Sequence, residues 1–246
     1  MARAQRQLGF EFRTWGGARA NAGRPPKGRT AGVSHLRRPS HSYTHPLHVT
    51  LRVGRGVPSL REHSVFSVVR RALAQGKRHF GFSLVHFSVQ RNHLHLIAEA
   101  SDRRALSRGM QGLSIRVARA VNAQLGRRGK LFVDRYHARA LTSPRSVRLV
   151  LRYVLLNMSK HFHGPQGPAD ARSSAVASGF VDGCSSAPWF SEFRRPAELV
   201  FGVREARDDW QRASGSNEPP VVRPESWLLR SGWKRAGAFD VDETPG

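Results

Sequence analysis

Two histidines separated by one residue, His93 and His95, stand in the apolar segment HLHLIAEA, residues 93–100. Side chains alternate between the two faces of a β-strand, so both imidazoles point to one face and Leu94 points to the other. Imidazole pairs at this spacing suit a divalent cation. Because the chain holds 12 histidines, a chance pair at the surface is the favoured interpretation of the His-Leu-His triplet taken alone.

A second pair of chemically useful side chains, Tyr153 and Asn157, lies four residues apart in a segment with helical periodicity. Residues at i and i+4 share one face of a helix. The amide oxygen of Asn157 can act as a third, hard ligand beside two imidazoles, which leaves positions for phosphate oxygens and water. The phenolate of Tyr153 is then a nucleophile for a phosphodiester beside a Lewis acid. On periodicity alone, a half-buried helix tyrosine with its hydroxyl at the surface is the favoured interpretation.

Three further side chains are alternatives or additions to this set. Tyr136 is the competing nucleophile, but it stands between Arg135 and His137 on an expected strand, where base stacking or core packing is the favoured role. Glu99 shares the face of the two histidines and either reaches a metal through water or forms a salt bridge with an arginine. Lys160 either orients a phosphate or is a solvated lysine.

Hydrophobic periodicity predicts the elements that position these residues. The expected strands are residues 45–53, 79–89, 93–100 and 130–141, and the expected helices span about 60–77, 103–125 and 144–158. Asp102 is a suitable N-cap for the second helix, and Pro144 suits the first position of the third. This order predicts an α+β, ferredoxin-like (split βαβ) fold, with a four-stranded antiparallel sheet and two packed helices on one face. The last helix carries Tyr153 and covers part of the other face.

The charge of the chain is unevenly distributed. Its formal net charge is +24, and residues 44–163 carry 22 Lys and Arg against 4 Asp and Glu. Residues 1–43 read as a flexible basic arm, and residues 164–246 as an irregular, mildly acidic extension. A domain this cationic binds polyanions through counterion release. Nucleic acid is therefore the expected partner, well ahead of an anionic membrane surface.

Several function classes are excluded by composition. The single cysteine, Cys184, rules out an intrachain disulfide and a cysteine-based zinc site. The N-terminus lacks the apolar run of a signal peptide, and no stretch has the length of a membrane span. We therefore expect a cytoplasmic protein with no membrane partner. In the extension, Trp189, Phe190 and Phe193 predict a segment that docks on the core, followed by a weak helix near residues 196–212.

Three segments match a known family in order and spacing. They are RNHLHLIAEA, GKLFVDRYHARAL and SVRLVLRYVLLNMSKH, within residues 45–162. Together they resemble the single-tyrosine HUH transposases, an IS200-like family, and among these the REP-associated tyrosine transposases. Upstream, GGARANAGRPPKG resembles the Gly/Arg arm common before this domain. The resemblance covers about half of the chain and implies a transposase domain at residues 44–163.

The resemblance assigns roles to individual residues. It implies that His93 and His95 are metal ligands, that Asn157 occupies the third-ligand position, that Tyr153 is the nucleophile, and that the ion is Mg²⁺ or Mn²⁺. Members of the family cleave single-stranded DNA near a hairpin, form a 5′-phosphotyrosine and release a 3′-hydroxyl. Candidate DNA contacts in this chain are Arg91, Arg135, Tyr136, Arg152 and Lys160.

The sequence also departs from the family pattern. Arg91 stands where the family often has Pro, and residues 157–160 read Asn-Met-Ser-Lys in place of Asn-Pro-Val-Lys. These departures leave open a second hypothesis, a non-catalytic, domesticated protein that binds single strands. Exposed aromatics on the sheet would then stack on bases, with Phe80, Phe82 and Phe87 as the candidates. A replication initiator or relaxase ranks lower because the extension is short, and both a monomer and a homodimer remain open.

Overall fold

A computed structural model describes residues 39–157, 181–195, 200 and 202–243, all of which lie in one unit, residues 35–246. The expected basic arm up to residue 38, and Lys160, lie outside these described residues. Five antiparallel strands form one sheet in the order β2-β3-β4-β1-β5. The strands are β1 (Leu47–Arg52), β2 (Arg78–His79), β3 (Phe82–Val89), β4 (His93–Ala100) and β5 (His137–Ala140).

The split βαβ arrangement predicted from the sequence is confirmed. β4 lies between β1 and β3, and β5 pairs with the outer side of β1, which is the order expected for this fold. The two-residue strand β2 is an addition at the far edge, where Phe80 and Gly81 turn the chain back into β3. At the β3–β4 turn, the amide of Gln90 donates to the carbonyl of His93, closing the expected hairpin.

One face of the sheet is covered by α1 (His63–Gln75) and α2 (Arg103–Gln124). Their apolar sides pack on alternate strand residues, such as Val49 of β1 and Leu96 of β4, which are fully buried. Asp102 caps α2 as predicted, because its carboxylate accepts from the amides of Arg104 and Ala105.

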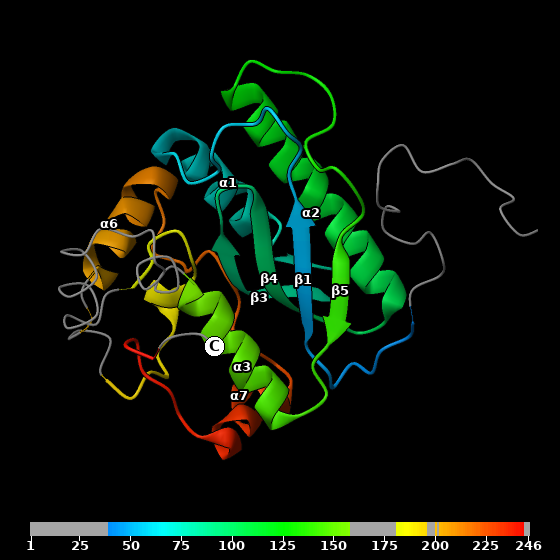
Figure 1. Ribbon diagram of the computed structural model, residues 1–246, viewed down its shortest axis with the longest axis vertical. Helices are drawn as coiled ribbons and strands as arrows, with labels where there is room; N and C mark the ends of the chain where they lie inside the picture. The colour runs from blue at the N-terminus through cyan, green and yellow to red at the C-terminus, as the bar shows by residue number, and fades with distance from the viewer. Residues whose placement is uncertain (1–38, 158–180, 196–199, 201, 244–246) are drawn as a thin grey trace, which may run out of the picture. The chain divides into compact units, whose positions relative to one another are not determined.

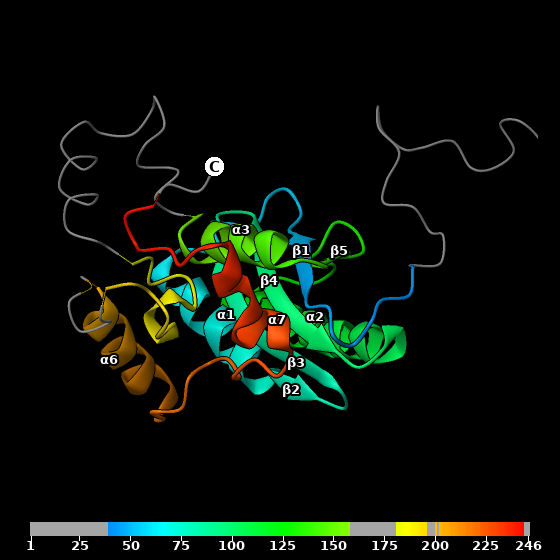
Figure 2. The ribbon, with the colours of Figure 1, turned by 90° about the horizontal axis from the view of Figure 1, so that it is seen from below.

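The other face is partly covered by α3 (Pro144–Leu155), and Figure 2 shows α3 on the opposite side of the sheet from α1 and α2. Ser143 caps α3 in a reciprocal hydrogen-bond pair with Ser146, and Pro144 occupies the first turn. Ile97, which follows Leu96 on β4, points to this face and packs in a second core with Leu151 and Val154 of α3. α3 lies over the β3 and β4 side, so β1 and β5 remain visible beside it in Figure 1.

The extension is more ordered than its composition suggested. It contributes a 3₁₀ turn η1 (Ala187–Trp189), α6 (Val203–Ser214), α7 (Trp227–Arg230) and a 3₁₀ turn η3 (Gly232–Ala236). As expected, Phe190 and Phe193 dock: they are buried in the second core. They pack there against Phe239, whose ring stacks on Phe190 at 5.7 Å between centroids. The second core therefore joins α3, which ends at Leu155, to Phe190, Phe193 and Phe239 of the extension.

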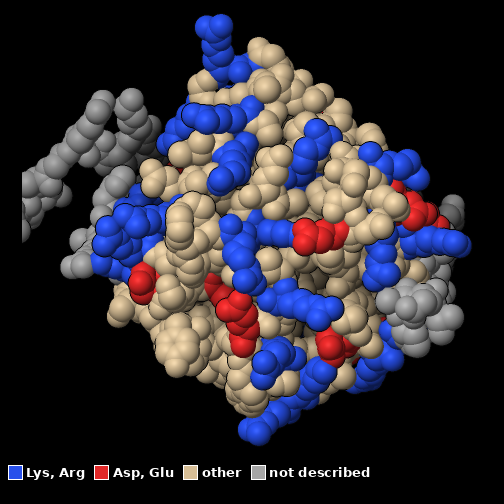
Figure 3. All heavy atoms as spheres, turned by 180° about the vertical axis from the view of Figure 1, so that it is seen from behind, with Lys and Arg blue, Asp and Glu red and all other residues tan. Residues whose placement is uncertain are grey.

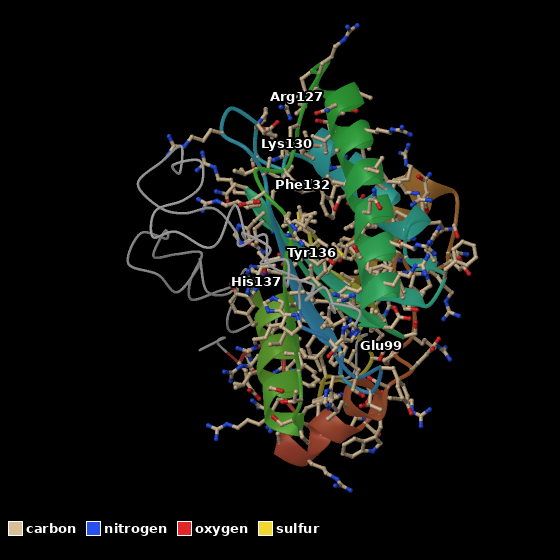
Figure 4. The ribbon with its side chains drawn as sticks, turned by 90° about the vertical axis from the view of Figure 1, so that its right-hand side faces the viewer. Glu99, Arg127, Lys130, Phe132, Tyr136 and His137 are labelled. Atoms are coloured by element: carbon tan, nitrogen blue, oxygen red, sulfur yellow. The ribbon has the colours of Figure 1, made fainter. Side chains whose placement is uncertain are left out.

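The prediction of one strand over residues 130–141 is wrong for residues 130–136. β5 begins at His137, opposite Thr50, and the next bridge joins Val53 to Phe132. Between these two pairs, β1 contributes two residues (51–52), whereas the segment before β5 contributes four (133–136). The two surplus residues cannot pair with β1, so this segment, which includes Tyr136, loops out of the sheet. Figure 4 shows Tyr136 and His137 following one another where this loop enters the β5 edge.

In the part of the chain that the structure describes, no helix combines the length and the apolar character needed to cross a bilayer.

Candidate active site

Strand pairing gathers imidazoles on the face of the sheet that α3 partly covers. β1 pairs with β4 so that Thr50 lies opposite His95 and Arg52 opposite His93. The Nε2 atoms of His93 and His95 are 3.0 Å apart. Two cis ligands of an octahedral ion, with bonds of about 2.1 Å, are separated by about 3.0 Å, so the spacing fits a shared cation.

The second nitrogen of each imidazole has a hydrogen-bond partner. Nδ1 of His93 lies 2.8 Å from Oδ1 of Asn92, an acceptor, so this nitrogen carries the proton and donates it. Nδ1 of His95 lies 3.2 Å from Nε2 of His48 and 3.4 Å from Oγ1 of Thr50. A cation shared by the two Nε2 atoms requires both Nδ1 atoms to carry the protons, so that each Nε2 atom offers a lone pair. Lone pairs at that distance repel unless a proton or a cation lies between them.

Burial keeps the central imidazoles neutral. Desolvation lowers the pKa of His95 to about 3, with smaller contributions from the nearby His93 and His48. Desolvation also lowers the pKa of His48 to about 4, helped by the positive charge of Arg139 and by His137. A neutral imidazole has the lone pair that a metal ligand or a hydrogen-bond acceptor needs.

Tyr153 brings its phenol to the same point from α3. The hydroxyl lies 3.2 Å from Nε2 of His95, and the two rings meet edge to face with centroids 4.9 Å apart. The helix holds Tyr153 there because the neighbouring residues Leu151, Val154 and Leu155 are fully buried in the second core. The structure thus brings together three of the residues singled out from the sequence, namely His93, His95 and Tyr153.

The third-ligand position is less directly defined. Asn157 is buried at 4% exposure and lies two residues beyond the end of α3, not on the helix itself, as the i, i+4 argument assumed. Among the described residues, no group of three or more His, Cys, Asp or Glu side chains is arranged to hold a metal. The imidazole pair therefore needs a ligand of another type, and the role of Asn157 stays a prediction.

The uncovered half of this face, on β1 and β5, is cationic. His48, Thr50 and Arg52 alternate along β1 with residues buried in the first core. Across the pairing, His137 lies opposite Thr50 and Arg139 opposite His48, so both point to the same side. Both arginines are exposed beside the imidazole cluster. The arrangement offers positive charge to an anionic strand next to Tyr153.

The candidate DNA contacts are distributed over several places. Arg91 is exposed in the β3–β4 turn, two residues from His93, and Arg135 is exposed in the loop before β5. Arg152 on α3 forms an ion pair with Glu243 at 3.4 Å. Tyr136 packs against the first core, whereas Tyr153 packs against the second, so the two tyrosines lie on opposite sides of the sheet.

Glu99 has a different role from either of those expected. Its carboxylate accepts hydrogen bonds from the backbone amides of Glu225 and Ser226, both at 2.8 Å. The buried carboxylate thus anchors the start of α7 to the end of β4, and its oxygens are engaged by the extension instead of by an arginine. Figure 4 places Glu99 well below Tyr136 and His137, toward the far end of the sheet.

Sequence reasoning missed His48, Thr50 and Asn92. His48 and Thr50 show the same two-residue alternation as the metal strand, within HPLHVTLRV. This alternation shows that His48 and Thr50 share one face of β1, but not that the face lies beside His93 and His95. That follows only from the direct pairing of β1 with β4, which the sequence pattern does not reveal. Asn92 directly precedes His93, and a short polar side chain at that position is a signal that could have been used.

The part of the chain that holds this site is similar to known proteins. Residues 41–156 match the family model described as "Transposase IS200 like". No curated protein matches the chain. Its fold is similar to that of a solved structure, "Structure of the REP associates tyrosine transposase bound to a REP hairpin", with a TM-score of 0.42 and 18% identity; the match covers 52% of this chain and 74% of that chain. Residues 41–156, which hold the imidazole cluster and Tyr153, are therefore similar to the IS200-like transposases.

Proposed function

We propose that this protein is a metal-dependent endonuclease and strand transferase that cuts single-stranded DNA near hairpins with Tyr153 as its nucleophile. One observation carries the proposal: Nε2 of His95 lies 3.0 Å from Nε2 of His93 and 3.2 Å from the phenol oxygen of Tyr153. The match to the family model supports the same reaction class, since the matched residues include all three side chains. The choice of hairpin DNA rests on the family resemblance of the sequence.

The proposed step exchanges one phosphodiester for another. The phenol of Tyr153 loses its proton to water, and the phenolate oxygen attacks the phosphorus. The bond from phosphorus to O3′ breaks, and O3′ takes up a proton and leaves as a 3′-hydroxyl. The downstream strand stays attached as a 5′-phosphotyrosine. Because the new bond is again a phosphodiester, a different 3′-hydroxyl can reverse the step and join two strands without a nucleotide cofactor.

A divalent ion, Mg²⁺ or Mn²⁺, would be held by His93 and His95, with the amide of Asn157 as the third protein ligand. The ion would offset the charge that develops on the phosphate during attack. The spacing and protonation of the two imidazoles fit such an ion, as described above. An amide oxygen is a hard donor that suits both ions.

The substrate strand would lie on the uncovered half of the sheet. Arg52 and Arg139 are exposed there on strands that neighbour the imidazole cluster, and they would contact phosphates on the two sides of the cleaved one. A single strand suits this site better than a duplex, because Tyr153 is half-buried where α3 meets the sheet. The flexible backbone of a single DNA strand reaches such a position more easily than a rigid double helix does. Arg91, at the turn next to His93, would extend the same surface.

A nicking assay tests the proposal. Hairpin oligonucleotides with single-stranded arms are labelled at the 3′ end and incubated with the protein and Mn²⁺. We expect a labelled protein–DNA adduct that survives denaturant and is absent with EDTA. Tyr153→Phe should abolish the adduct and leave binding within about twofold, whereas Tyr136→Phe should retain both. An adduct formed by Tyr153→Phe would contradict the assignment.

The same assay discriminates the second hypothesis. A protein that binds the hairpin strand but forms no adduct with Mn²⁺ or Mg²⁺ would be a non-catalytic DNA binder on the same fold. The second hypothesis expected aromatic side chains of the sheet to stack on bases. Phe82 and Phe87 of β3 cannot do so, because both are fully buried beneath α1 and α2.

A further inference from the structure

A cavity of about 1150 Å³ lies at the opposite end of the sheet from the imidazole cluster. Its wall is built from five separate parts of the chain: the approach to β1, the β2–β3 hairpin, the end of β4, the start of α3 and the start of α7. The lining residues include Tyr43, Gly81, Glu99, Thr142, Pro144 and Trp227. The cavity is large enough for a nucleotide-sized ligand.

Two exposed aromatic side chains line this cavity. Among the described residues, only three aromatic side chains are largely exposed, and two of them, Tyr43 at 72% and Trp227 at 47%, belong to the lining. Phe80, the third, is not part of it. Exposed aromatics in a concave site are suited to stacking on a flat ligand. Trp227 is held in place by the guanidinium of Arg235, 5.0 Å from its ring.

The charge of the lining argues for a neutral ligand. Its one arginine, Arg78, is paired at 3.0 Å with Glu225, and Glu99 adds a second carboxylate. A phosphate placed here would face two carboxylates. Hydroxyl groups complete the wall at Thr44, Ser83, Ser101 and Thr142. Aromatic rings with surrounding hydroxyls match a nucleobase, which has a π-face and hydrogen-bonding edges but no charge.

The cavity lies within reach of a strand bound at Tyr153. Pro144, in its wall, begins the helix that carries Tyr153 nine residues later, a rise of about 13 Å. Glu99 and His95 are four residues apart on β4, which also corresponds to about 13 Å. Nucleotides in a stacked strand repeat every 3.4 Å or so, so the cavity is up to about four nucleotides from the cleaved phosphate. Arg139 is exposed on the face between the two places.

We infer that this cavity binds one unpaired base of the DNA strand, flanking the position that Tyr153 attacks, by stacking on Tyr43. The inference rests on the proposed function for the presence of the strand. Phosphates would be held at Arg52 and Arg139, and the base would be read some nucleotides away. Such a base contact would fix the register of cleavage relative to the hairpin, since phosphate contacts alone carry no sequence information.

The test measures binding, in EDTA, so that no cleavage is needed. The probe is a fluorescein-labelled DNA hairpin with oligothymidine arms on both sides, and single thymidines in the arms are replaced one by one by abasic sites. For the wild-type protein we expect one or two arm positions at which the abasic site weakens binding about fivefold or more, the range typical of base–aromatic stacking.

Variants of Tyr43, in the lining, and of Phe80, outside it, locate the contact. Tyr43→Ala should weaken binding by a similar factor. In this variant the abasic site should have no further effect, because both changes remove the same stacking interaction between the base and the ring of Tyr43. Tyr43→Phe keeps the ring and should bind like the wild type. Phe80→Ala removes an aromatic that is 84% exposed and lies outside the lining, so it should have no effect. Because Tyr43 is so exposed, its removal leaves the core intact.

The outcomes separate this inference from the proposed function. If the wild type binds the probe but neither an abasic site nor Tyr43→Ala weakens binding, the base cavity is wrong and the proposed function stands. An equal loss with Phe80→Ala would also overturn the cavity, since it would indicate a general effect of exposed aromatics. If the wild type binds no single-stranded arm at all, both proposals fall.

Discussion

Residue by residue, the candidate site depends on the partners of its imidazoles as much as on the imidazoles themselves. Oδ1 of Asn92 accepts from Nδ1 of His93, and Nε2 of His48 lies 3.2 Å from Nδ1 of His95, so each ring has a hydrogen-bond partner on the side away from the facing Nε2 atoms. Partners of this kind hold a ligating imidazole in the correct tautomer and orientation. His48 is thus a positioning residue, acting through His95.

The first prediction concerns His48. His48→Leu removes the acceptor for His95 and should weaken Mn²⁺ binding about 10- to 100-fold, because the ring of His95 loses its fixed tautomer. The affinity is measured by titration calorimetry without DNA. Thr50→Val is the matched control: Thr50 lies 3.4 Å from the same nitrogen, so its loss should cost less. Unchanged Mn²⁺ affinity in His48→Leu would contradict the positioning role.

At this scale the sequence supplied the reactive groups but not their partners. Spacing and family resemblance identified His93, His95 and Tyr153, which are together in the structure. His48 was not identified, because its contact with His95 depends on which strands pair and in what register. Register is a long-range property that no local pattern encodes.

Among the elements, the sheet is shared by two cores that use alternate residues of the same strands. On β4, Leu96 packs under α1 and α2, whereas Ile97 packs under α3 and the extension. The extension is therefore part of what holds α3, and with it Tyr153, against the sheet. Its segment around Ser186 reaches β3 directly, since the hydroxyl of Ser186 accepts from the amide of Phe87.

The second prediction uses a histidine at this junction. His86 is buried, bonded at 3.2 Å to Ser186, and burial lowers its pKa to about 3. The unfolded chain, with an ordinary pKa near 6.5, binds a proton that the folded chain does not. Stability should therefore fall as pH decreases from 6.5 toward 3, by up to about 1.4 kcal/mol per pH unit from this group alone.

Urea unfolding at a series of pH values measures this contribution. His86→Gln cannot titrate, so its free energy of unfolding should decline less steeply than that of the wild type below pH 6.5, whatever constant offset the substitution adds. His63→Gln, at an exposed position on α1, is the control and should follow the wild type. Parallel curves for His86→Gln and the wild type would show that His86 is not buried as a neutral group.

The elements themselves were largely predictable, and the exception has a clear cause. Periodicity and caps correctly placed β1, β3, β4 and the three helices, because their apolar residues recur with the period of a strand or of a helix. The segment before β5 has an equally strand-like composition, but β1 offers it too few pairing positions. In the extension, the docking of Phe190 and Phe193 was predicted, but the contribution of Leu228, Trp233 and Phe239 to the core was not, since these residues are scattered and meet only through contact with α3.

Across the whole molecule, positive charge is not confined to the candidate site. The side of the sheet covered by α1 and α2 also displays many Lys and Arg side chains, with a few carboxylates between them (Figure 3). α2 contributes the exposed Arg104, Arg108 and Arg119. Net charge therefore explains attraction to nucleic acid in general, and position must explain which arginines contact the strand.

The third prediction separates the two surfaces by salt dependence. Each phosphate contact on a single strand contributes a slope of about −0.7 to the plot of log affinity against log salt. Arg52→Gln should reduce the magnitude of that slope by about this amount for an oligothymidine strand, whereas Arg108→Gln on α2 should leave it nearly unchanged. Equal reductions in the two variants would mean that the strand does not prefer the face that carries Tyr153.

The most direct test of the central claim is to identify the amino acid that carries the DNA. The chain has 3 tyrosines, and trypsin releases each in a separate peptide: Tyr43 in residues 38–52, Tyr136 in 136–139 and Tyr153 in 153–160. After reaction with hairpin DNA and Mn²⁺ and nuclease trimming, mass spectrometry should find the nucleotide on the peptide 153–160. A nucleotide on either of the other two peptides, or none on any, would contradict the account.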